Sequence, residues 1–246
     1  MRYLILSDIH ANLEALEAVL ATVLPDSYDR VLVLGDVVGY GADPNAVVDR
    51  VRAMKPDIII RGNHDKVASG VEDADGFNYM AREAADWTYD ELTPENRQYV
   101  ATLPYGPKIY DDLIEVCHGA PFDEDAYIFD PVDALHALKM VQRPVCLFGH
   151  THLPVVFYLT PAGLEIKSIE GPETRFHLDE HNKYLINPGS VGQPRDGDPR
   201  AAYAMLDGAT RQMTVYRVPY PIHLAQEKIS AAGLPPALAH RLALGR

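Results

Sequence analysis

The chain has 246 residues, of which 47% are hydrophobic and 23% charged, with 17 glycines and 19 prolines. This composition is typical of a globular protein and excludes the collagen, coiled-coil and low-complexity classes. The 22 basic and 35 acidic residues give a formal net charge of −13. Lys and Arg are scattered singly, and phosphate-backbone binding needs a basic stripe, so polymeric nucleic acid is not expected as a partner.

Only two cysteines occur, Cys117 and Cys146, each within an apolar run. We interpret them as buried thiols, because a secreted disulfide framework uses more cysteines. No signal peptide is expected, since Asp8 interrupts the apolar run Tyr3–Leu6. No apolar stretch approaches the roughly 20 residues of a membrane span. We therefore expect a cytoplasmic protein with no membrane partner.

The first part of the chain alternates short apolar runs with helical patterns. Strands are predicted at Tyr3–Leu6, Val31–Leu34 and Ile58–Ile60. Between these runs, apolar residues recur at helical spacing around 13–23 and 47–51. This β-α-β-α-β order predicts a parallel sheet with right-handed crossovers.

The remainder of the chain is expected to add helices and then further strands. Residues from about 66 to 104 form a predicted helical insertion, in which Thr93 caps a helix that begins with Pro94. From about 105 the strands dominate, with one helix near 132–141 and a helical tail at about 222–244. Pro/Gly turns between the strands predict antiparallel ladders in a second sheet. The predicted strands are Lys108–Tyr110, Leu113–Cys117, Val145–Phe148, Val155–Leu159, Leu164–Ile169, Tyr184–Ile186, Ala201–Leu206 and Met213–Val218. We expect residues 1–246 to form a single domain.

Polar side chains follow five of the predicted strands. The segments are Asp8-Ile9-His10, Gly35-Asp36, Gly62-Asn63-His64-Asp65, Cys117-His118-Gly119 and Gly149-His150-Thr151-His152. Ligand sites in α/β sheets form beyond the carboxyl ends of strands, so these segments can converge on one cleft. Carboxylate, carboxamide and imidazole groups without a thiolate favour divalent Mn, Fe, Co, Ni or Zn over Ca or a Cys-rich zinc site.

The series D-x-H, G-D, G-N-H-D, H-G and G-H-T-H, in this order, resembles the calcineurin-like metallophosphoesterase superfamily. The match spans residues 8–152, and Asn187-Pro188-Gly189-Ser190 resembles a further segment of its prokaryotic phosphodiesterase branch. The resemblance implies an α/β fold of two facing mixed β-sheets flanked by helices, a four-layer sandwich. It also implies a dinuclear metal centre at one edge.

The resemblance further assigns roles to single residues. Three would hold the first metal, namely Asp8, His10 and His152. Three would hold the second metal, namely Asn63, His118 and His150. Asp36 would bridge both ions, and His64 would be the catalytic histidine next to the leaving group. Two cations about 3.5–4 Å apart can share a water and lower its pKa, and a protonated His64 can give a proton to the leaving oxygen. We expect two divalent ions, Mn foremost, with Fe, Ni, Co or Zn as alternatives.

The activity implied is metal-dependent hydrolysis of phosphoester bonds, by in-line attack of a metal-bridging hydroxide on a small phosphodiester. One alternative is a phosphoprotein or nucleotide phosphomonoesterase. Phosphoprotein phosphatases, however, carry an Asp-Arg-Gly run and an Asn-His-Glu motif where this chain has Val38-Gly39-Tyr40 and ends its third motif in Asp65. Another alternative is a non-catalytic protein-binding scaffold, like the retromer subunit that resembles this family. That use would be marked by loss of His64 or of the ligands, and all are present.

Some neighbouring residues leave two interpretations open. Asp65 is predicted to cap a helix or to support the site from behind. Asn12 caps the following helix or contacts substrate phosphate. Arg195 clamps a phosphate or forms an ion pair with Asp196 or Asp198. Asn187-Pro188-Gly189-Ser190 is expected to be a turn that shapes the floor of the cleft.

Overall fold

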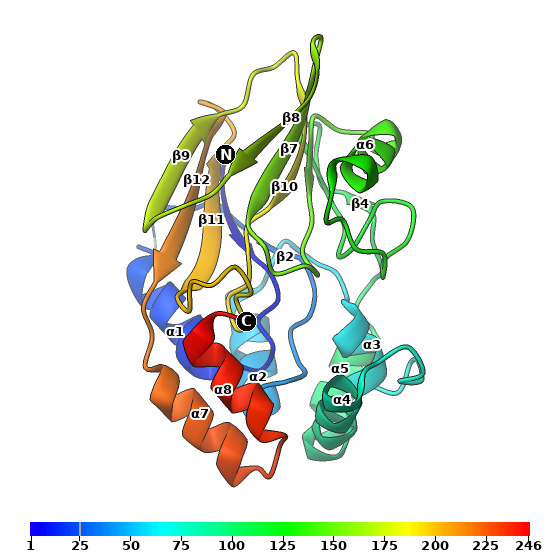
Figure 1. Cartoon of the computed structure of the whole chain (residues 1–246), viewed down its shortest axis with the longest axis vertical. Helices are drawn as coiled ribbons and strands as arrows, with labels where there is room; N and C mark the ends of the chain where they lie inside the picture. Colours follow the sequence, from blue (N-terminus) through cyan, green and yellow to red (C-terminus); the bar gives the residue numbers. More distant parts are fainter. Residues whose placement is uncertain (25) are drawn as a thin grey trace.

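The computed structural model describes residues 1–24 and 26–246 and contains two six-stranded β-sheets that face each other (Figure 1). The apolar side chains between the sheets come from both, for example Ile5 and Leu32 from one and Val145 and Ile186 from the other. Both sheets mix parallel and antiparallel pairs. The fold predicted from the resemblance is therefore confirmed.

The first sheet has the strand order β3-β2-β1-β11-β12-β9. Its strands are β1 (Arg2–Leu6), β2 (Arg30–Val33), β3 (Ile58–Ile59), β9 (Glu173–His177), β11 (Ala201–Asp207) and β12 (Gln212–Val218). The pairs β1–β2 and β2–β3 are parallel, as the β-α-β-α-β order predicts.

The prediction that every strand after residue 105 joins the second sheet is wrong for β11 and β12. Strand β11 pairs antiparallel with β1, with Leu4 opposite Met205, and β12 pairs with β11. Strand β9 was not predicted at all. Its side chains are exposed or half-buried, because it lies at the edge of the sheet, so it lacks the apolar run that indicates a strand.

The second sheet has the strand order β4-β5-β6-β10-β7-β8. Its strands are β4 (Lys108–Ile109), β5 (Ile114–Val116), β6 (Val145–Leu147), β7 (Val155–Thr160), β8 (Gly163–Ser168) and β10 (Lys183–Asn187). The pairs β5–β6 and β6–β10 are parallel, so the prediction of antiparallel ladders holds only for the outer strands. The free cysteines Cys117 and Cys146 are buried beside this sheet, with their sulfur atoms 3.6 Å apart.

Helices cover the outer faces of both sheets. They are α1 (Leu13–Thr22), α2 (Pro44–Met54), α3 (Asn63–Ala68), α4 (Tyr79–Glu91), α5 (Pro94–Ala101), α6 (Pro131–Met140), α7 (Ile222–Ala231) and α8 (Pro236–Leu244). Helix α6 packs on the second sheet and α1 and α2 pack on the first, while α7 packs against α1 and α8. Thr93 caps α5 by accepting a hydrogen bond from Asn96 N, as predicted.

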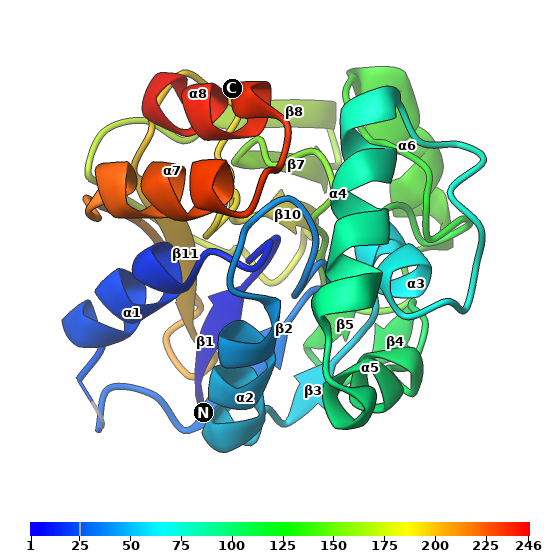
Figure 2. The same ribbon diagram turned by 90° about the horizontal axis from the view of Figure 1, so that it is seen from below.

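The helices α3–α5 lie on one side of the molecule and the α7–α8 pair on the other, with the loop that follows β2 between them (Figure 2). This loop, residues 34–43, carries Asp36 and Tyr40. Segments distant in sequence therefore border the same loop. No helix within 1–24 and 26–246 is long and apolar enough to cross a membrane.

Candidate metal centre

Most of the expected site residues lie on tight loops that begin where strands end, and Asn63 and His64 begin helix α3. Five of them have a left-handed backbone, with φ between 49° and 66°: Asp8, His10, Asp36, His150 and His152. This conformation is unfavourable for residues other than glycine and concentrates at functional sites. Hydrogen bonds between the loops stabilise it, for example from His10 N to Asp36 O at 2.9 Å. The loops are held in a strained shape that directs these side chains to one place.

The first group of donor atoms comes from Asp8, His10, Asp36 and His152, all buried and within 4.8 Å of one another. His10 Nε2 is 3.4 Å from Asp36 Oδ2, and His152 Nε2 is 3.5 Å from Asp8 Oδ1. The second group comes from Asp36, His118 and His150, with the same spacing limit. Asp36 belongs to both groups, so one carboxylate connects them.

Asn63 lies at the second group, because its Oδ1 is 3.3 Å from His118 Nε2. His118 Nε2 is also 3.4 Å from Asp36 Oδ2. All seven side chains expected to be ligands are thus brought together from segments spread over 145 positions of the chain, from Asp8 to His152.

Main-chain carbonyls orient the imidazole rings. The Nδ1 atoms of His10, His118 and His152 lie 3.2, 2.8 and 2.6 Å from the carbonyl oxygens of Val38, Leu34 and Gln193. A carbonyl only accepts, so Nδ1 carries the proton and Nε2 presents a lone pair. Such outer hydrogen bonds fix the tautomer of metal-binding histidines.

The facing lone pairs of His10 and His152 require a cation. Their Nε2 atoms are 3.0 Å apart, and a hydrogen bond between them would need one ring to be doubly protonated. Burial holds the pKa of both rings well below the usual value, so neither ring is cationic near neutral pH. A divalent ion between the two nitrogens and the neighbouring carboxylates relieves this repulsion, so the donor set fits a metal.

Electrostatics keep most of the imidazoles in the form that binds metal. Burial lowers the pKa of His150 to about 3, and a neutral ring binds a metal without first losing a proton. Burial acts to raise the pKa of Asp36, but the charge of His118 and its hydrogen bond to Asp36 hold that pKa well below the usual value. Burial acts to lower the pKa of His118, and the charge of Asp36 outweighs this and raises it. Without a metal, a second proton on the His118 ring compensates the negative charge of Asp36.

His64 is buried beside the two groups but belongs to neither. Its ring centroid is 4.2 Å from that of Tyr40 and 4.7 Å from that of Phe77, and its Nδ1 has no hydrogen-bond partner among the described residues. Its main-chain N–H donates to Asp36 Oδ1 at 2.9 Å, which couples its position to the shared carboxylate. Burial lowers the pKa of His64 to about 4.

Asp65 and Asn12, for which the sequence leaves two interpretations open, both form hydrogen bonds at the start of a helix. Asp65 accepts hydrogen bonds from Gly62 N and Val38 N, so it caps α3 and attaches it to the Asp36 loop. Asn12 accepts from Ala15 N at 3.1 Å and therefore caps α1.

The turn at 187–190 supports the site through side chains as well as backbone, which sequence reasoning missed. Ser190 Oγ donates to Asp8 O at 2.8 Å, and Asn187 Nδ2 donates to Gly149 O at 2.7 Å. Both residues are fully buried. These hydrogen bonds connect the turn to the loop that carries Asp8 and to the loop that carries His150 and His152.

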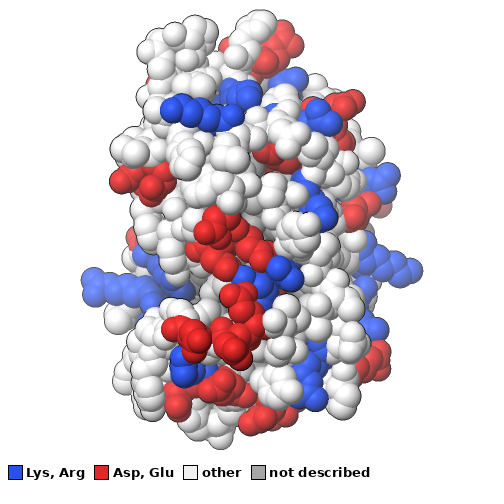
Figure 3. Space-filling view, turned by 90° about the vertical axis from the view of Figure 1, so that its right-hand side faces the viewer, with Lys and Arg blue, Asp and Glu red and all other residues white. Residues whose placement is uncertain are grey.

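A pocket of about 210 Å³ opens beside the second group. Its walls include Tyr40, Asn63, His64, Phe77, Tyr127 and His150. Phe77 belongs to the aromatic-rich insertion at about 66–104, which the sequence favours as a small helical core over a substrate platform; here Phe77 lines the pocket. At its mouth Lys66 binds Glu72 at 2.7 Å and Asp125 at 2.5 Å. The face that carries α3–α6 has acidic side chains gathered at its middle around a few basic ones (Figure 3).

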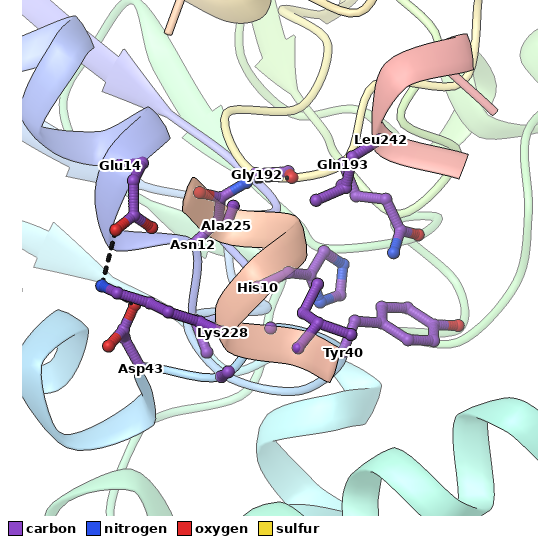
Figure 4. A pocket seen from close by; sticks show the side chains of 14 residues that line it. His10, Asn12, Glu14, Tyr40, Asp43, Gly192, Gln193, Ala225, Lys228 and Leu242 are labelled. Atoms are coloured by element: carbon purple, nitrogen blue, oxygen red, sulfur yellow. Dashed lines mark hydrogen bonds and ion pairs between the residues drawn. The ribbon is translucent and has the colours of Figure 1, made fainter. Parts of the chain in front are cut away.

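A second, small pocket of about 10 Å³ is lined by residues that include His10, Asn12 and Tyr40 (Figure 4). Tyr40 lines both pockets. Lys228 of α7 binds Glu14 at 2.5 Å and Asp43 at 2.7 Å, one on α1 and the other before α2. These ion pairs attach the C-terminal helices to the loops of the metal-site residues.

Residues 1–211 match the family model of the calcineurin-like phosphoesterase superfamily domain. The chain belongs to this superfamily. It is 37% identical over 247 residues to an uncharacterized protein of Methanocaldococcus jannaschii, covering 98% of this chain and 97% of the relative. It is 28% identical to the phosphodiesterase YfcE of Escherichia coli, covering 84% and 88%.

The solved structures agree with the fold. A metallophosphoesterase from Sphaerobacter thermophilus superimposes with a TM-score of 0.87 at 39% identity, covering 100% of this chain and 99% of that one. A hypothetical protein from Pyrococcus horikoshii superimposes with a TM-score of 0.80 at 20% identity, covering 100% and 98%. The chain is a metal-dependent phosphoesterase, and its buried Asp/His groups fit the metal centre of such an enzyme.

Proposed function

We propose that this phosphoesterase hydrolyses small phosphodiesters at a site for two divalent ions, Mn²⁺ foremost. The ligands of one ion are Asp8, His10 and His152. The ligands of the other are Asn63, His118 and His150. Asp36 is the bridge. The observation that carries the proposal is the 3.0 Å approach of two Nε2 lone pairs, His10 and His152, beside a carboxylate shared by two donor groups.

Two divalent ions, when bound, supply positive charge to the phosphoryl oxygens and lower the pKa of water enough to provide the nucleophile. Two carboxylates, Asp8 and Asp36, face four positive charges, so the loaded site attracts an anionic phosphate. Asn63 adds a neutral oxygen. The net charge of the site is thus opposite to that of the protein as a whole.

We assign to His64 the hydrogen bond or proton that the leaving group needs. Because burial lowers the pKa of His64 to about 4, its neutral ring predominates near neutral pH, and the protonated form is favoured only at acidic pH. In the reaction, a water oxygen bonds to phosphorus in line with the departing ester oxygen, and the ester P–O bond breaks without a covalent enzyme intermediate. The departing oxygen takes a proton. His64 lines the 210 Å³ pocket, lies outside both ligand groups, and is held rigidly between Tyr40 and Phe77. Such a positioned imidazole donates a hydrogen bond or proton as charge develops on the leaving oxygen.

The surroundings favour small substrates. The pocket is below the roughly 300 Å³ at which sites for drug-sized ligands begin. The acidic face in Figure 3 has no basic groove for a nucleic-acid strand. YfcE, a relative at 28% identity, is named a phosphodiesterase, and this name supports a phosphodiester substrate rather than a phosphomonoester. A cytoplasmic location stays a prediction from the sequence.

The test uses full-length protein, stripped with a chelator and reloaded separately with Mn²⁺, Co²⁺, Ni²⁺, Fe²⁺ or Zn²⁺. Each sample is assayed on bis(4-nitrophenyl) phosphate and on 4-nitrophenyl phosphate. We expect activity only after reloading, highest with Mn²⁺, and a higher kcat/KM for the diester. A preference for the monoester would instead support the phosphomonoesterase alternative. Absence of hydrolysis with every metal would contradict the proposal.

A further inference from the structure

Two arginines from distant parts of the chain meet at one tyrosine beside the metal centre. Arg195 follows the 187–190 turn, and Arg241 lies on α8 near the C-terminal end of the sequence. Their Cζ atoms are 5.8 and 5.9 Å from the centre of the Tyr40 ring. The same ring is 4.2 Å from that of His64 and 4.8 Å from that of His10, centroid to centroid. The two guanidinium groups are therefore one aromatic ring away from the reaction site.

Neither arginine has a carboxylate side-chain partner within ion-pair distance among residues 1–24 and 26–246. Arg195 Nη2 donates to Gln193 Oε1 at 2.9 Å, and its buried Nε has no partner. Arg241 Nε donates to the main-chain oxygen of Arg246 at 2.5 Å. Most of the N–H groups of the pair remain available to a ligand.

The ion-pair alternative for Arg195 is wrong. Asp196 pairs with Arg217, and Asp198 pairs with Arg200 at 2.6 Å. The two nearest acidic residues in the sequence are therefore already neutralised by other arginines. Arg195 keeps its full charge at the site.

Two like charges that are partly removed from water repel each other unless an anion joins them. Burial and, after it, the charge of Arg195 hold the pKa of Arg241 below its usual value. This local excess stands out in a chain with a net charge of −13. Guanidinium groups bind phosphate through paired N–H donors, so a phosphate is the ligand that such a pair suits.

The position of Arg241 is built into the fold. Helix α7 is attached to Glu14 and Asp43 through Lys228. Helix α8 is attached to α7 by a hydrogen bond from Gln226 Nε2 to Ala239 O at 2.8 Å. These contacts hold α8 against the loop that carries Tyr40, so the two arginines are placed before any ligand arrives.

We propose that Arg195 and Arg241 together bind a second phosphate of the substrate, one that is not hydrolysed at the metal centre. The substrate class is a small phosphodiester that carries a further phosphate group. This inference rests on the proposed function, because it places the scissile phosphate at the Asp36 groups. A phosphate held by the pair lies beside Tyr40 and adjacent to, but separate from, the one that reacts.

The kinetic test compares two chromogenic diesters that differ by one phosphate. They are the 4-nitrophenyl ester of thymidine 5′-phosphate and the same compound with an additional 3′-phosphate. We expect wild-type protein to prefer the bisphosphate through a lower KM. In Arg195→Gln and Arg241→Gln, the loss in kcat/KM should be about 10-fold or more larger for the bisphosphate than for the monophosphate, since each change removes charge-assisted hydrogen bonds. Arg241→Lys should lose less, because it keeps the charge.

Arg97→Gln is the matched control. Arg97 also lies over a tyrosine, with its Cζ 4.3 Å from the centre of the Tyr89 ring, but it belongs to α5 outside the site. Arg97→Gln should leave kcat/KM unchanged for both substrates. Equal losses on both substrates in the Arg195 and Arg241 variants would overturn the proposal and place the pair at the scissile phosphate. No loss on either substrate would overturn it as well.

A binding measurement separates this inference from the proposed hydrolysis. Isothermal titration calorimetry with inorganic pyrophosphate compares metal-loaded wild type with Arg195→Gln/Arg241→Gln. We expect the double variant to bind at least 10-fold more weakly, with an unchanged metal content. Equal affinities would overturn the anion site even if the protein hydrolyses diesters. A 10-fold difference would support the site even if neither chromogenic ester is hydrolysed, in which case the proposed function fails alone.

Discussion

A Cβ atom placed on Gly39 would lie 2.6 Å from Nδ1 of His64. Gly39 also has φ of +88°, a conformation that residues with a Cβ adopt only with strain. The absence of a side chain at position 39 therefore gives the His64 ring its space. The Gly35-Asp36-Val37-Val38-Gly39 segment supplies both a shared carboxylate and the surface on which His64 rests.

We predict that Gly39→Ala displaces the His64 ring and lowers kcat while both metal ions stay bound, because Gly39 supplies no ligand atom. The backbone strain should also reduce the free energy of unfolding by about 1–2 kcal/mol. Steady-state kinetics, elemental analysis and urea unfolding measure the three quantities. Gly171→Ala is the control, since Gly171 also has a positive φ, of +77°, but a Cβ there would meet nothing within 4 Å among the described residues. A kcat in Gly39→Ala equal to that of wild type would show that the position of the His64 ring does not depend on the absence of a side chain at residue 39.

His64→Asn should keep both metals and lower kcat about 10²–10⁴-fold on a diester with a poor leaving group, because general acid catalysis contributes about that much. The loss should shrink for nitrophenyl esters, since a stable leaving anion needs little protonation. The comparison requires conditions in which the chemical step limits the rate. An unchanged kcat on the poor substrate would remove the acid role from His64, and loss of one metal would move His64 into the ligand set.

Fully reloaded wild type should bind two divalent ions per chain, and Asp36→Asn should weaken the binding of both. The reason is that Asp36 belongs to both donor groups. Elemental analysis after dialysis gives the stoichiometry, and thermal melts report the stabilisation, about 2.7 kcal/mol when the free metal is 100 times its Kd. Asp112→Asn, in the exposed turn between β4 and β5, is the control. One ion per chain in active wild type would contradict the dinuclear assignment.

Metal-free protein should lose stability as the pH falls from 6 to 4.5, with His150 as one cause. Burial lowers the pKa of His150 from 6.5 to about 3. In this pH window the unfolded chain binds a proton at His150 and the folded chain does not, so the free energy of unfolding rises with pH. Removing the group in His150→Gln should therefore reduce the slope by about 1.4 kcal/mol per pH unit. Urea unfolding of chelator-treated protein at four pH values measures it, and identical slopes for both proteins would contradict the shift.

Affinity for duplex DNA should be negligible at physiological salt. The net charge is −13, and the face in Figure 3 gathers acidic side chains. Fluorescence anisotropy with a labelled 20-base-pair duplex, titrated at several salt concentrations, tests this expectation. Tight binding with a steep salt dependence would show that a basic groove exists on another face.

The sequence by itself determined the order of the first three strands, and it predicted which side chains come together as candidate metal ligands. Each site residue directly follows an apolar strand run, and the carboxyl ends of strands meet at one edge of a sheet, so convergence is predictable from local patterns. The caps formed by Asn12, Asp65 and Thr93 are equally local, because a cap bonds a backbone group within three residues of itself.

Only the tertiary structure decided which sheet β11 and β12 join, because an apolar run buries equally well in either sheet and the choice depends on pairing with β1, about 200 positions away. The same holds for Arg195. The sequence shows that Arg195 is charged. Whether it forms an ion pair with Asp196 or Asp198 depends on the tertiary structure, in which these residues pair with Arg217 and Arg200. Its partner Arg241 reaches Tyr40 only because α7 packs against α1 and brings α8 near the loop of Tyr40. Contacts between segments far apart in the chain have no local signature, since they arise from which apolar faces pack together.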